Sequence, residues 1–572
     1  MSGPPITPGS DGHFFPEDEA AVADLVRFAS ADGRRLRVRG AGHAPPGTTA
    51  VDDPSDLVLD LGGMRELRVV DDRERLVEAQ AGIHLGRDPS AGDPQGSLES
   101  SLLYRLSNQY GWTLSSTGGI THQTLGGYLA TTSAGGTLQH SLLDQVVAVR
   151  LVDGRGEVRV FSGWDEEPGL AAVLPSLGVL GVITAVTLRC EPLFTIAGQE
   201  AIADLDQAEI DLAGPGSRER PSLASFLAQA EYARIEWWPQ RGAERILIWQ
   251  AQRTPPQPGF RPTRYEEFTR YPVLAEALIS TLYVIFGNLE DPDRANALLR
   301  RNAGHVNGAL DRIAASGRLT PRRRQVVRLL PGALRTAARL TPLLGALSPV
   351  LERSLPWLVP VMLDRVLPLD AHKPGMRRGE PQSFRDWSWQ GLPMDNQASD
   401  VLMASRFTEL WVPLPRSEEV IRVLRAYFAE PTRTADSYRR TGLYAYELYG
   451  APASGGWLHP GYSDGSDEWH QGALRVDVYW FSDNAEDPLE RFFVQFWELL
   501  REHDIPFRLH WGKEQPASTR ADRGWVEVLA ARYPRWNDFL ALRAALDPDE
   551  VFLTDYWRDR LGLWGETEAS TA

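Results

Sequence analysis

Glycines and a histidine stand together in the stretch LRVRGAGHAPPGTT, which covers residues 36–49. Gly40 and Gly42 follow a strand-like run, and glycines allow successive backbone N–H groups to approach a phosphate. A dinucleotide fingerprint would place a third glycine three positions later and begin a helix there, but Pro45 and the proline after it predict a loop. Two interpretations follow: an anion-binding loop that carries His43, or a structural turn with a histidine at the surface.

A second glycine-rich segment covers residues 115–136. Glycine weakens strands, so a chain keeps it where another group approaches the backbone. The glycines whose backbone amides we expect to be exposed here are Gly118, Gly119, Gly126, Gly127, Gly135 and Gly136. Two such loops ahead of a compact strand-rich module favour a long, flat, phosphate-bearing ligand, although tight turns in a β-rich domain explain any single glycine.

Composition limits the classes of protein to which the chain can belong. Its 572 residues predict two or three domains, and a hydrophobic content of 42% provides for a large core. The formal net charge of −16 argues against nucleic-acid binding, which needs a basic face. A single cysteine, Cys190, allows no internal disulfide and no cysteine metal cluster, and no metal site is expected. Because no secretory signal and no run of about 18 apolar residues is visible, we expect a soluble cytoplasmic protein.

The first third of the chain has the pattern of a helix followed by many short strands. Apolar residues at helical spacing after Pro16 predict the helix, and alternation predicts strands near 34–40, 56–61 and 75–82. Residues 102–111 predict another helix that ends at Gly111. Residues 145–162 predict a hairpin around the turn Asp153-Gly154.

The rest of the chain alternates aromatic strands with helices. Residues 232–252 predict a hairpin of large aromatic strands, and 407–414, 442–450 and 473–481 predict three further strands. Amphipathic helices are predicted at 417–430 and 489–503. Residues 255–400 differ from their surroundings, because they are helix-rich, broken by prolines and locally basic.

Several of these segments, taken in order, resemble the PCMH-type FAD-binding domain of the vanillyl-alcohol oxidase superfamily. They are RFASADGRRLRVRGAGHA, LVLDLGGMRELRVVDDRERLVEAQAGIHLG, GGITHQTLGGYLATTSAGG, LLDQVVAVRLVDGRGEV and LGVLGVITAVTL. FRLHWGK and YPRWNDFLALRAALDPDEVFLTDYW resemble its aldonolactone and alditol oxidase branch. The resemblance covers about residues 14–195 and 400–560.

The resemblance implies an α+β fold with a two-subdomain FAD-binding domain at 14–195. A substrate domain at 196–560 is expected to be an antiparallel sheet flanked by helices, with a large helical insertion at about 255–400. Its C-terminal part, 500–560, is expected to return to the FAD-binding domain. Residues 1–13 would be a flexible arm and 561–572 a tail.

The resemblance also implies the residues that contact FAD. The loop from Arg39 to Ala44 would wrap the pyrophosphate, and His43 would bond covalently to the flavin 8α-methyl group. Ala44 departs from the serine usual in the family. Small residues at the flavin ring would leave room for O2, and the segment from Gly178 through Gly181 to Thr184 would meet the adenine. The implied cofactor-binding residues are Arg39, Gly40, Ala41, Gly42, His43, Ala44, Thr117, Gly118, Gly119, Thr124, Gly126, Gly127, Thr131, Gly181, Val182, Ile183 and Lys513.

The implied catalytic residues are Glu447, Tyr449, His510 and Lys513. A lysine cation near the flavin would stabilise negative charge on its reduced form. Tyr449 stands where the branch carries an arginine, and Asp477 stands where it offers a histidine, so a clamp for polyhydroxy substrates is only partly present. Glu409, among apolar neighbours, is either a pocket residue or a paired structural carboxylate.

The expected reaction is oxidation of a CH–OH group of an alditol, aldonolactone or related alcohol to a carbonyl, with O2 as acceptor and H2O2 as product. Alternatives are an oxidase of a bulky, sterol-like alcohol, a flavin dehydrogenase with another acceptor, and a flavin-bearing binding or membrane-surface protein with little turnover. The insertion would contact a membrane surface, cap an apolar pocket, or pack as a helical subdomain. Its arginines are Arg322, Arg323, Arg324, Arg328, Arg335 and Arg339.

Overall fold

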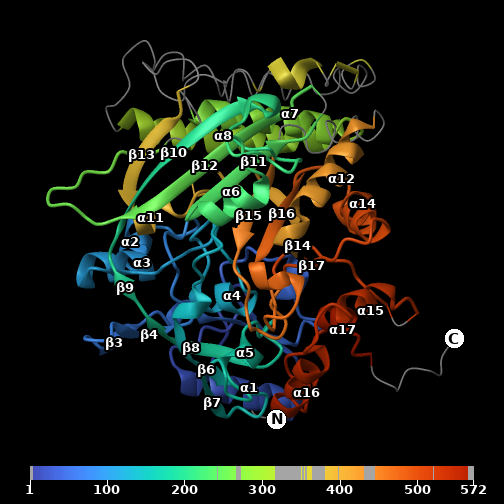
Figure 1. Cartoon of the computed structure of the whole chain (residues 1–572). Coiled ribbons are helices and arrows are strands. Elements are labelled where there is room, and N and C mark those ends of the chain that lie inside the picture. The colour runs from blue at the N-terminus through green and yellow to red at the C-terminus, as the bar shows by residue number, and fades with distance from the viewer. Residues whose placement is uncertain are drawn as a thin grey trace.

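The computed structural model describes residues 4–240, 242–265, 272–315, 350, 353–354, 357–361, 363, 380–396, 399–430, 445–519 and 521–564. Two antiparallel sheets lie at opposite ends of the protein, the smaller from the first third of the chain and the larger from the rest (Figure 1). The insertion arginines predicted between 322 and 339 lie outside the described residues.

The smaller sheet has five strands in the order β3-β4-β8-β6-β7. They are β3 (Leu67–Asp71), β4 (Leu76–Gln80), β6 (Val146–Val152), β7 (Val158–Ser162) and β8 (Val182–Arg189). The hairpin predicted at 145–162 is confirmed as the β6–β7 pair. Beside this sheet, β1 (Leu36–Arg39) pairs in parallel with β2 (Leu57–Asp60), and β5 (Trp112–Thr113) pairs with β9 (Glu191–Pro192).

The helices of this part are short apart from the first. They are α1 (Glu19–Asp32), α2 (Pro94–Glu99), α3 (Leu102–Arg105), α4 (Leu125–Ala130) and α5 (Leu170–Val173). The predicted start of α1 near Pro16 is corrected to Glu19, because the Asp18 side chain accepts the backbone N–H of Ala21 as its N-cap. The helix predicted to end at Gly111 does end there, in a left-handed cap with φ 67°.

The larger sheet has eight strands in the order β13-β10-β12-β11-β15-β16-β14-β17, and every neighbouring pair is antiparallel. They are β10 (Thr195–Asp204), β11 (Tyr232–Trp238), β12 (Arg245–Thr254), β13 (Gln382–Trp387), β14 (Ser405–Pro413), β15 (Tyr446–Ala451), β16 (Ala473–Phe481) and β17 (Arg508–Leu509). The predicted aromatic hairpin is β11–β12.

Alternation along β12 explains why this sheet is covered on both faces. Ile246 and Ile248 join one hydrophobic cluster with α6 (Leu223–Gln229), α12 (Ser417–Ala429) and α14 (Pro488–Glu502). Leu247 and Trp249 join another cluster with α7 (Pro272–Gly287) and α8 (Pro292–Ala315). Helices α7 and α8 of the predicted insertion thus lie across one face (Figure 1, top), whereas its last part is not a helical insertion, because β13 is an edge strand of the sheet itself.

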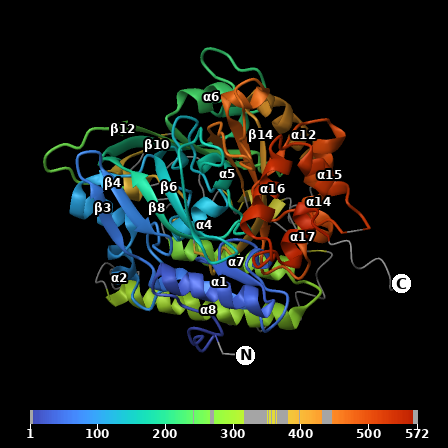
Figure 2. The same cartoon turned by 90° about the horizontal axis from the view of Figure 1, so that it is seen from below.

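The end of the chain returns to the first third. Helices α15 (Gly524–Ala530), α16 (Trp536–Leu546) and α17 (Asp555–Leu561) share a hydrophobic cluster with α1 and the smaller sheet (Figure 2). The backbone N–H of Leu36 on β1 donates to the Val551 carbonyl. Among the described helices, none has both the length and the apolar character to cross a membrane.

Candidate active site

One cavity of about 420 Å³ lies among the loops of the first third of the chain, and we call it the loop-lined cavity. Backbone of the 39–44 stretch, the start of α4 and the approach to β8 form most of its wall. From the predicted set it is lined by Arg39, Gly40, Ala41, Gly42, His43, Ala44, Thr124, Gly126, Gly127, Thr131, Gly181, Ile183 and Lys513. Thirteen predicted positions therefore come together around one space.

The glycines of this cavity are required by close packing of its loops. A Cβ atom at Gly40 would stand 2.7 Å from Oγ1 of Thr124, and one at Gly126 would stand 3.0 Å from Cβ of Ala81. Gly42 and Gly181 adopt φ values of +79° and +147°, which side-chain-bearing residues rarely take. The wall consequently has stretches of bare backbone at these glycines, which fits a long cofactor bound through its phosphates and flat rings.

A buried arginine, Arg37 on β1, fastens the loops around the cavity. Its guanidinium donates to the carbonyls of Thr48, Leu177, Gly178 and Phe552 at distances of 2.7–3.2 Å. Burial lowers the pKa of Arg37 to about 10, so the side chain remains charged at neutral pH. The sequence interpretation missed Arg37, and the alternation of Leu36, Arg37, Val38 and Arg39 gives no local signal that Arg37 is the buried arginine.

Two residues of the predicted cofactor set, Thr117 and Val182, line neither the loop-lined cavity nor the second cavity described below. Val182 lies between Gly181 and Ile183 on β8, so its side chain points to the opposite face and is buried in the core. Thr117 is also buried, 3% exposed. A contact of either residue with the cofactor therefore stays a prediction.

A second cavity of about 610 Å³ lies on the face of the larger sheet, and we call it the sheet-lined cavity. Its wall comes from β11, β15, β16 and β14, with α7 and Leu363 over it. Both cavities are lined by Gly42, His43, Ala44, Gln123, Ser133, His510, Gly512 and Lys513. The sheet-lined cavity also takes in Gly118, Gly119, Glu447 and Tyr449, so all four predicted catalytic residues meet there.

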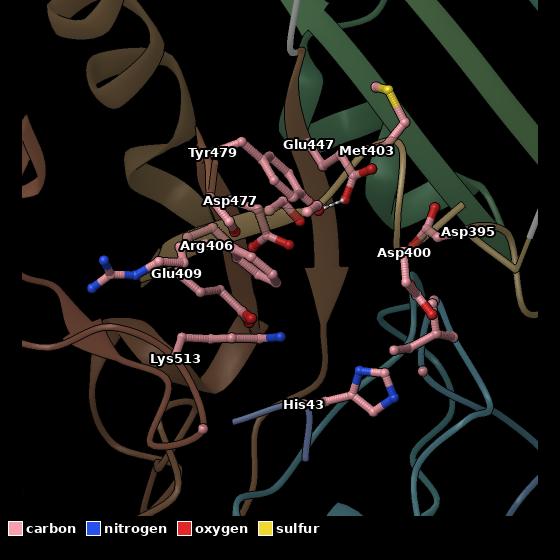
Figure 3. Close-up of a pocket in the computed structure, with 18 of the residues that line it drawn as sticks. His43, Asp395, Asp400, Met403, Arg406, Glu409, Glu447, Asp477, Tyr479 and Lys513 are labelled. Carbon is pink, nitrogen blue, oxygen red and sulfur yellow. Dashed lines mark hydrogen bonds between the residues drawn. The ribbon is translucent and has the colours of Figure 1, made fainter. Parts of the chain in front are cut away.

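His43 stands where the two cavities meet (Figure 3). Burial, together with the nearby His122 and Lys513, lowers its pKa to about 4. The His122 ring lies 5.7 Å from that of His43, and its Nδ1 is 3.5 Å from an Asp400 carboxylate oxygen. At neutral pH the His43 imidazole is therefore neutral, with a lone pair available for a bond.

Four acidic residues form a row across the strands that line the sheet-lined cavity. In the strand register Glu236 on β11 pairs with Glu447 on β15, Glu447 pairs with Asp477 on β16, and Asp477 pairs with Glu409 on β14. Three of them, Glu236, Asp477 and Glu409, are buried at 8% exposed or less, and Glu447 is partly exposed. Burial of ionisable side chains next to one another costs folding free energy unless they are neutral or paired, so this row points to a site rather than to folding.

The carboxyl groups of the row differ in their protonation. Burial would raise the pKa of Glu409, but Arg475, His510 and Lys513 outweigh it and hold the pKa at about 2. Burial, with Asp395 and Glu236 nearby, raises the pKa of Glu447 to about 8. Glu409 is therefore ionised at neutral pH, whereas Glu447 is mostly neutral.

Hydrogen bonds hold these two carboxyl groups. The Nε of Arg475 and the Nε1 of Trp411 both donate to Glu409, each at 2.7 Å. The hydroxyls of Tyr449 and Tyr479 both donate to Oε2 of Glu447, at 2.9 and 2.5 Å. Glu409 thus lines the cavity and is also a paired carboxylate, so the two interpretations of it hold together.

Position 449 holds a tyrosine where the family carries an arginine, but an arginine reaches the cavity from another strand. Arg475 lies in register with Tyr449, and its guanidinium carbon is 4.9 Å from the tyrosine ring centre. A guanidinium is therefore present at the cavity from the neighbouring strand, where it also donates to the carbonyls of Ala134 and Gly135. The sequence interpretation missed it, although Arg475, Asp477 and Tyr479 alternate along one face of β16.

Lys513 and His510 lie on the turn after β17. The Lys513 ammonium sits 3.8 Å from the ring centre of Phe407 and points between Glu409 and His43 (Figure 3), and burial lowers its pKa. His510 accepts the Gly512 N–H at Nδ1, 3.0 Å away, and its ring also meets the backbone of Thr132. Since both sides of the His510 ring contact backbone, this histidine braces the turn that presents Lys513.

Asp395 explains why residue 119 is glycine. A Cβ there would stand 1.8 Å from Oδ2 of Asp395, and the Asp395 N–H donates to the Gly119 carbonyl at 2.8 Å. The other carboxylate oxygen accepts from Arg234 at 2.6 Å, and the Tyr449 hydroxyl lies 3.1 Å from Oδ2. Asp395, which the sequence interpretation missed, thus ties the second glycine-rich segment to the catalytic strand.

Known proteins resemble both ends of the chain. A family model described as an FAD binding domain matches residues 10–88, and one described as D-arabinono-1,4-lactone oxidase matches residues 470–560. The D-arabinono-1,4-lactone oxidase of Eremothecium gossypii is 28% identical over 42% of this chain and 41% of its own length. The chain thus spans about two fifths of that relative.

Other similarities run along the whole chain. The L-gulono-1,4-lactone dehydrogenase of Mycobacterium tuberculosis H37Rv is 25% identical over 96% of this chain and 95% of its own length. The crystal structure of cholesterol oxidase from B. sterolicum matches with a TM-score of 0.59 at 16% identity, over 96% of this chain and 93% of that one. This second likeness concerns the fold.

The loop-lined cavity lies within the matched FAD-binding segment and its surroundings, and Lys513 and Asp477 lie within the matched C-terminal segment. The chain therefore contains one segment that matches an FAD binding domain and one that matches a D-arabinono-1,4-lactone oxidase domain, and its fold is similar to that of the cholesterol oxidase.

Proposed function

We propose that the protein oxidises a CH–OH group of a small alditol, aldonolactone or related alcohol to a carbonyl, with FAD as cofactor and O2 as acceptor. One observation carries the proposal: the cavity built from FAD-binding loops opens, at His43 and Lys513, onto a cavity lined by ionisable side chains. The names of the relatives, which are oxidases and a dehydrogenase of sugar lactones, support the same reaction.

Bound FAD would accept a hydride from the substrate carbon, which is the chemistry that the cofactor itself supplies. The chain's residues would handle the accompanying proton and charge. Glu447 in its ionised form accepts the hydroxyl proton, because its raised pKa makes its conjugate base strong enough to do so near neutral pH. Lys513, between Glu409 and His43, stabilises negative charge that develops at the junction of the cavities.

His43 is proposed to hold the cofactor covalently. Its half-buried imidazole is neutral at physiological pH, as bond formation through a ring nitrogen requires. It also stands at the end of the loop-lined cavity where the flavin ring is expected. Support for the tether is the position and protonation of this histidine, together with the resemblance of its loop.

Anaerobic reduction of the flavin tests the proposed function. Purified protein should be yellow, and the flavin absorbance should bleach on addition of a polyol or an aldonolactone. Admission of air should restore the colour and release one H2O2 for each substrate oxidised. Colourless protein without FAD, or flavin that no alcohol reduces, would overturn the proposal.

A dehydrogenase with an acceptor other than O2 is the second candidate. The relative named L-gulono-1,4-lactone dehydrogenase aligns with almost the whole chain, which favours this alternative. Stopped-flow mixing of substrate-reduced protein with oxygenated buffer separates the two candidates. Slow reoxidation by O2 together with fast reoxidation by an artificial acceptor would identify a dehydrogenase.

A lipophilic alcohol is a further candidate substrate, because the far end of the sheet-lined cavity is apolar. Ile279 and Tyr283 of α7, with Leu363 and Met403, line that end, so described parts of the predicted insertion do cover the cavity. Apolar alcohols therefore belong in the substrate panel beside polyols and lactones. Preferential bleaching by a long-chain or ring-bearing alcohol would favour this candidate over the sugar derivatives.

A further inference from the structure

The hydroxyl group of Tyr449 lies between two carboxyl groups. Its oxygen is 2.9 Å from Oε2 of Glu447 on the same strand and 3.1 Å from Oδ2 of Asp395, which lies beyond α11 (Ser388–Gly391). A hydroxyl group carries one hydrogen, so Tyr449 donates to only one of these two oxygens at a time. The other carboxyl oxygen then faces a tyrosine lone pair, which is favourable only if that carboxyl group is protonated and donates in turn.

Asp395 is held as the ionised member of this pair of carboxyl groups. Arg234 on β11, whose side chain is fully buried, donates to its Oδ1 atom at 2.6 Å. A guanidinium is charged at neutral pH, and an adjacent opposite charge favours the carboxylate form. Asp395 is also fixed in position, because its backbone N–H donates to the Gly119 carbonyl at 2.8 Å. Its second oxygen, Oδ2, therefore presents a fixed acceptor to the Tyr449 hydroxyl.

Glu447 is the member of the pair that takes up a proton. Burial, together with the negative charges of Asp395 and Glu236, raises its pKa to about 8. Arg234 and the hydroxyl of Tyr479 act in the opposite direction without cancelling the rise. Near neutral pH the Glu447 carboxyl group therefore exists mostly as the neutral acid, which can donate one hydrogen bond.

Other ionisable groups also face this pair. Asp477 on β16 and Lys513 on the turn after β17 face Glu447, and burial raises the pKa of the first well above its usual range and lowers that of the second. Tyr449 faces Arg475, whose guanidinium carbon lies 4.9 Å from its ring centre. Within the described part of the chain, the hydroxyl of Tyr449 is nevertheless shared between the carboxyl groups of Glu447 and Asp395.

The protonation of Glu447 decides where the Tyr449 hydrogen points. When Glu447 is ionised, Tyr449 donates to it. When Glu447 has accepted a proton from an alcohol, it donates a hydrogen bond to the Tyr449 oxygen, and the tyrosine hydrogen turns to Asp395. The neutral acid is then held by a chain of two hydrogen bonds that ends on a carboxylate, and hydrogen bonds to ionised groups are the stronger ones.

We propose that Asp395 is a positioning residue that acts through the Tyr449 hydroxyl and lets Glu447 keep the substrate's proton as a neutral acid until the flavin is reoxidised. Oxidation of an alcohol by O2 gives a carbonyl compound and H2O2 and releases no net proton, so a base that retains the proton can return it when H2O2 forms. Arginine, which the family carries at the position of Tyr449, has no acceptor atom and could not serve in this way. This inference rests on the proposed function, because it takes Glu447 as the base.

The test uses full-length, flavin-loaded protein and two readouts. Infrared difference titration follows the protonated carboxyl band of Glu447, identified by its absence in Glu447→Gln, and kcat/KM for xylitol is measured against pH. Asp395→Asn should lower both midpoints by about one to two pH units. Its amide oxygen keeps the contact with Arg234, so its NH2 group faces Tyr449, whose hydrogen then stays on Glu447 and favours the ionised form.

Tyr449→Phe separates the effect of the hydroxyl from that of the Asp395 charge. By itself this substitution should lower the midpoint, because neutral Glu447 loses its acceptor. In its background Asp395→Asn should move the midpoint at most about half as far as in the wild type, since residues that act through one another are not additive. Equal shifts in the two backgrounds, or a midpoint raised by Tyr449→Phe, would show that the hydroxyl does not connect the two carboxyl groups and would overturn the inference.

Asp386→Asn is the matched control. Asp386 is a buried aspartate on β13 that accepts the Trp387 N–H, lies 3.3 Å from the Arg264 guanidinium and does not line the sheet-lined cavity. This substitution should leave both midpoints unchanged. Flavin absorbance and Tm show whether each variant is folded and loaded. If Asp395→Asn does not fold, Asp395→Ser takes its place, and the direction of the Tyr449→Phe shift remains decisive.

The two readouts separate this inference from the proposed function. A flavin that alcohols reduce, with midpoints that Asp395→Asn does not move, would overturn the inference and leave the oxidase intact. Infrared midpoints that move while the pH dependence of kcat/KM stays in place would overturn it as well, because Glu447 would then not be the base that the alcohol meets. A wild-type flavin that no alcohol reduces would overturn the proposed function and, with it, the role of Asp395 in the reaction.

Discussion

At the scale of single residues, burial is what gives the site its chemistry. His43 and Glu447 are ordinary titratable residues in the sequence, yet burial moves the pKa of the first down to about 4 and of the second up to about 8. Both shifts favour the neutral form, since transfer from water penalises charge. The cavity therefore contains a neutral imidazole and a weakly acidic carboxyl group at pH 7.

His43→Ala should convert a covalent flavin into a dissociable one. The alanine has no ring nitrogen to bond the cofactor, while the backbone wall of the loop-lined cavity remains in place. Acid precipitation should leave yellow pellets for the wild type and yellow supernatants for the variant, as measured by absorbance. Flavin in the wild-type supernatant would contradict the tether.

Glu447 should give the reaction a rising pH limb. Its pKa is raised, so the proton-accepting form is scarce at pH 6 and increases as the pH passes through about 8. We expect kcat/KM to increase about tenfold per pH unit below that value and to level off above it. Glu447→Gln should remove this limb and lower kcat by about 10²–10⁴-fold, and an unaltered limb in that variant would assign the proton to another group.

At the scale of elements, strand register assembles the site. Three neighbouring strands each contribute alternate residues to one face, so that Arg475 lies in register with Trp411 and Tyr449 while Asp477 lies in register with Glu409 and Glu447. A slip of one residue in β16 would turn Arg475 and Asp477 to the opposite face. The pairing of Glu409 with Arg475 is therefore both a structural and an electrostatic feature of the sheet.

Removal of one partner of this buried pair should destabilise the protein more than removal of both. Arg475→Met leaves Glu409 ionised and unpaired, which costs about 3–5 kcal/mol. The double variant Arg475→Met with Glu409→Gln removes both charges and should recover much of the loss. Thermal unfolding of flavin-loaded protein measures the two effects, and equal Tm values for the single and double variants would refute a strong pair.

At the scale of the whole molecule, segments far apart in the chain enclose the cofactor. Arg37 on β1 donates to carbonyls of residues near 48, 177 and 552, and the indole N–H of Trp557 donates to the same Thr48 carbonyl. The C-terminal helices, which begin at residue 524, therefore hold in place the glycine loop that begins at residue 40. Cofactor binding should consequently depend on contacts outside the glycine loops themselves.

Arg37→Lys should weaken flavin retention although no change is made at the cavity's glycines. An ammonium group cannot span the four carbonyls that the planar guanidinium reaches, so the loops near 48 and 177 would loosen. In a His43→Ala background, dialysis followed by flavin absorbance should show faster loss of FAD in the Arg37→Lys protein. Arg68→Lys, at an exposed arginine on β3, is the control and should retain FAD as its parent does.

Local patterns in the sequence are enough to predict the helices and strands named here and the identity of the cofactor. Alternation and turn residues predict the β6–β7 and β11–β12 hairpins, and Gly111 predicts a helix end, because these features depend on neighbouring residues only. The ordered motifs around His43 and Lys513 predict the FAD-binding fold and its cofactor. Outside those hairpins, however, no local pattern states which strands are neighbours in a sheet.

Tertiary structure decided what those residues meet. Arg475 reaches the cavity from β16 although the family position on β15 holds Tyr449, and Asp395 comes from a loop far beyond the glycine that it contacts, Gly119. Burial, which sets the protonation of Glu447 and Asp477, likewise arises only when the sheet, α7 and the returning C-terminal turn close together. The sequence thus identifies the chemical groups. Strand register and desolvation act between distant segments, and they determine which partners these groups contact and whether the groups are charged.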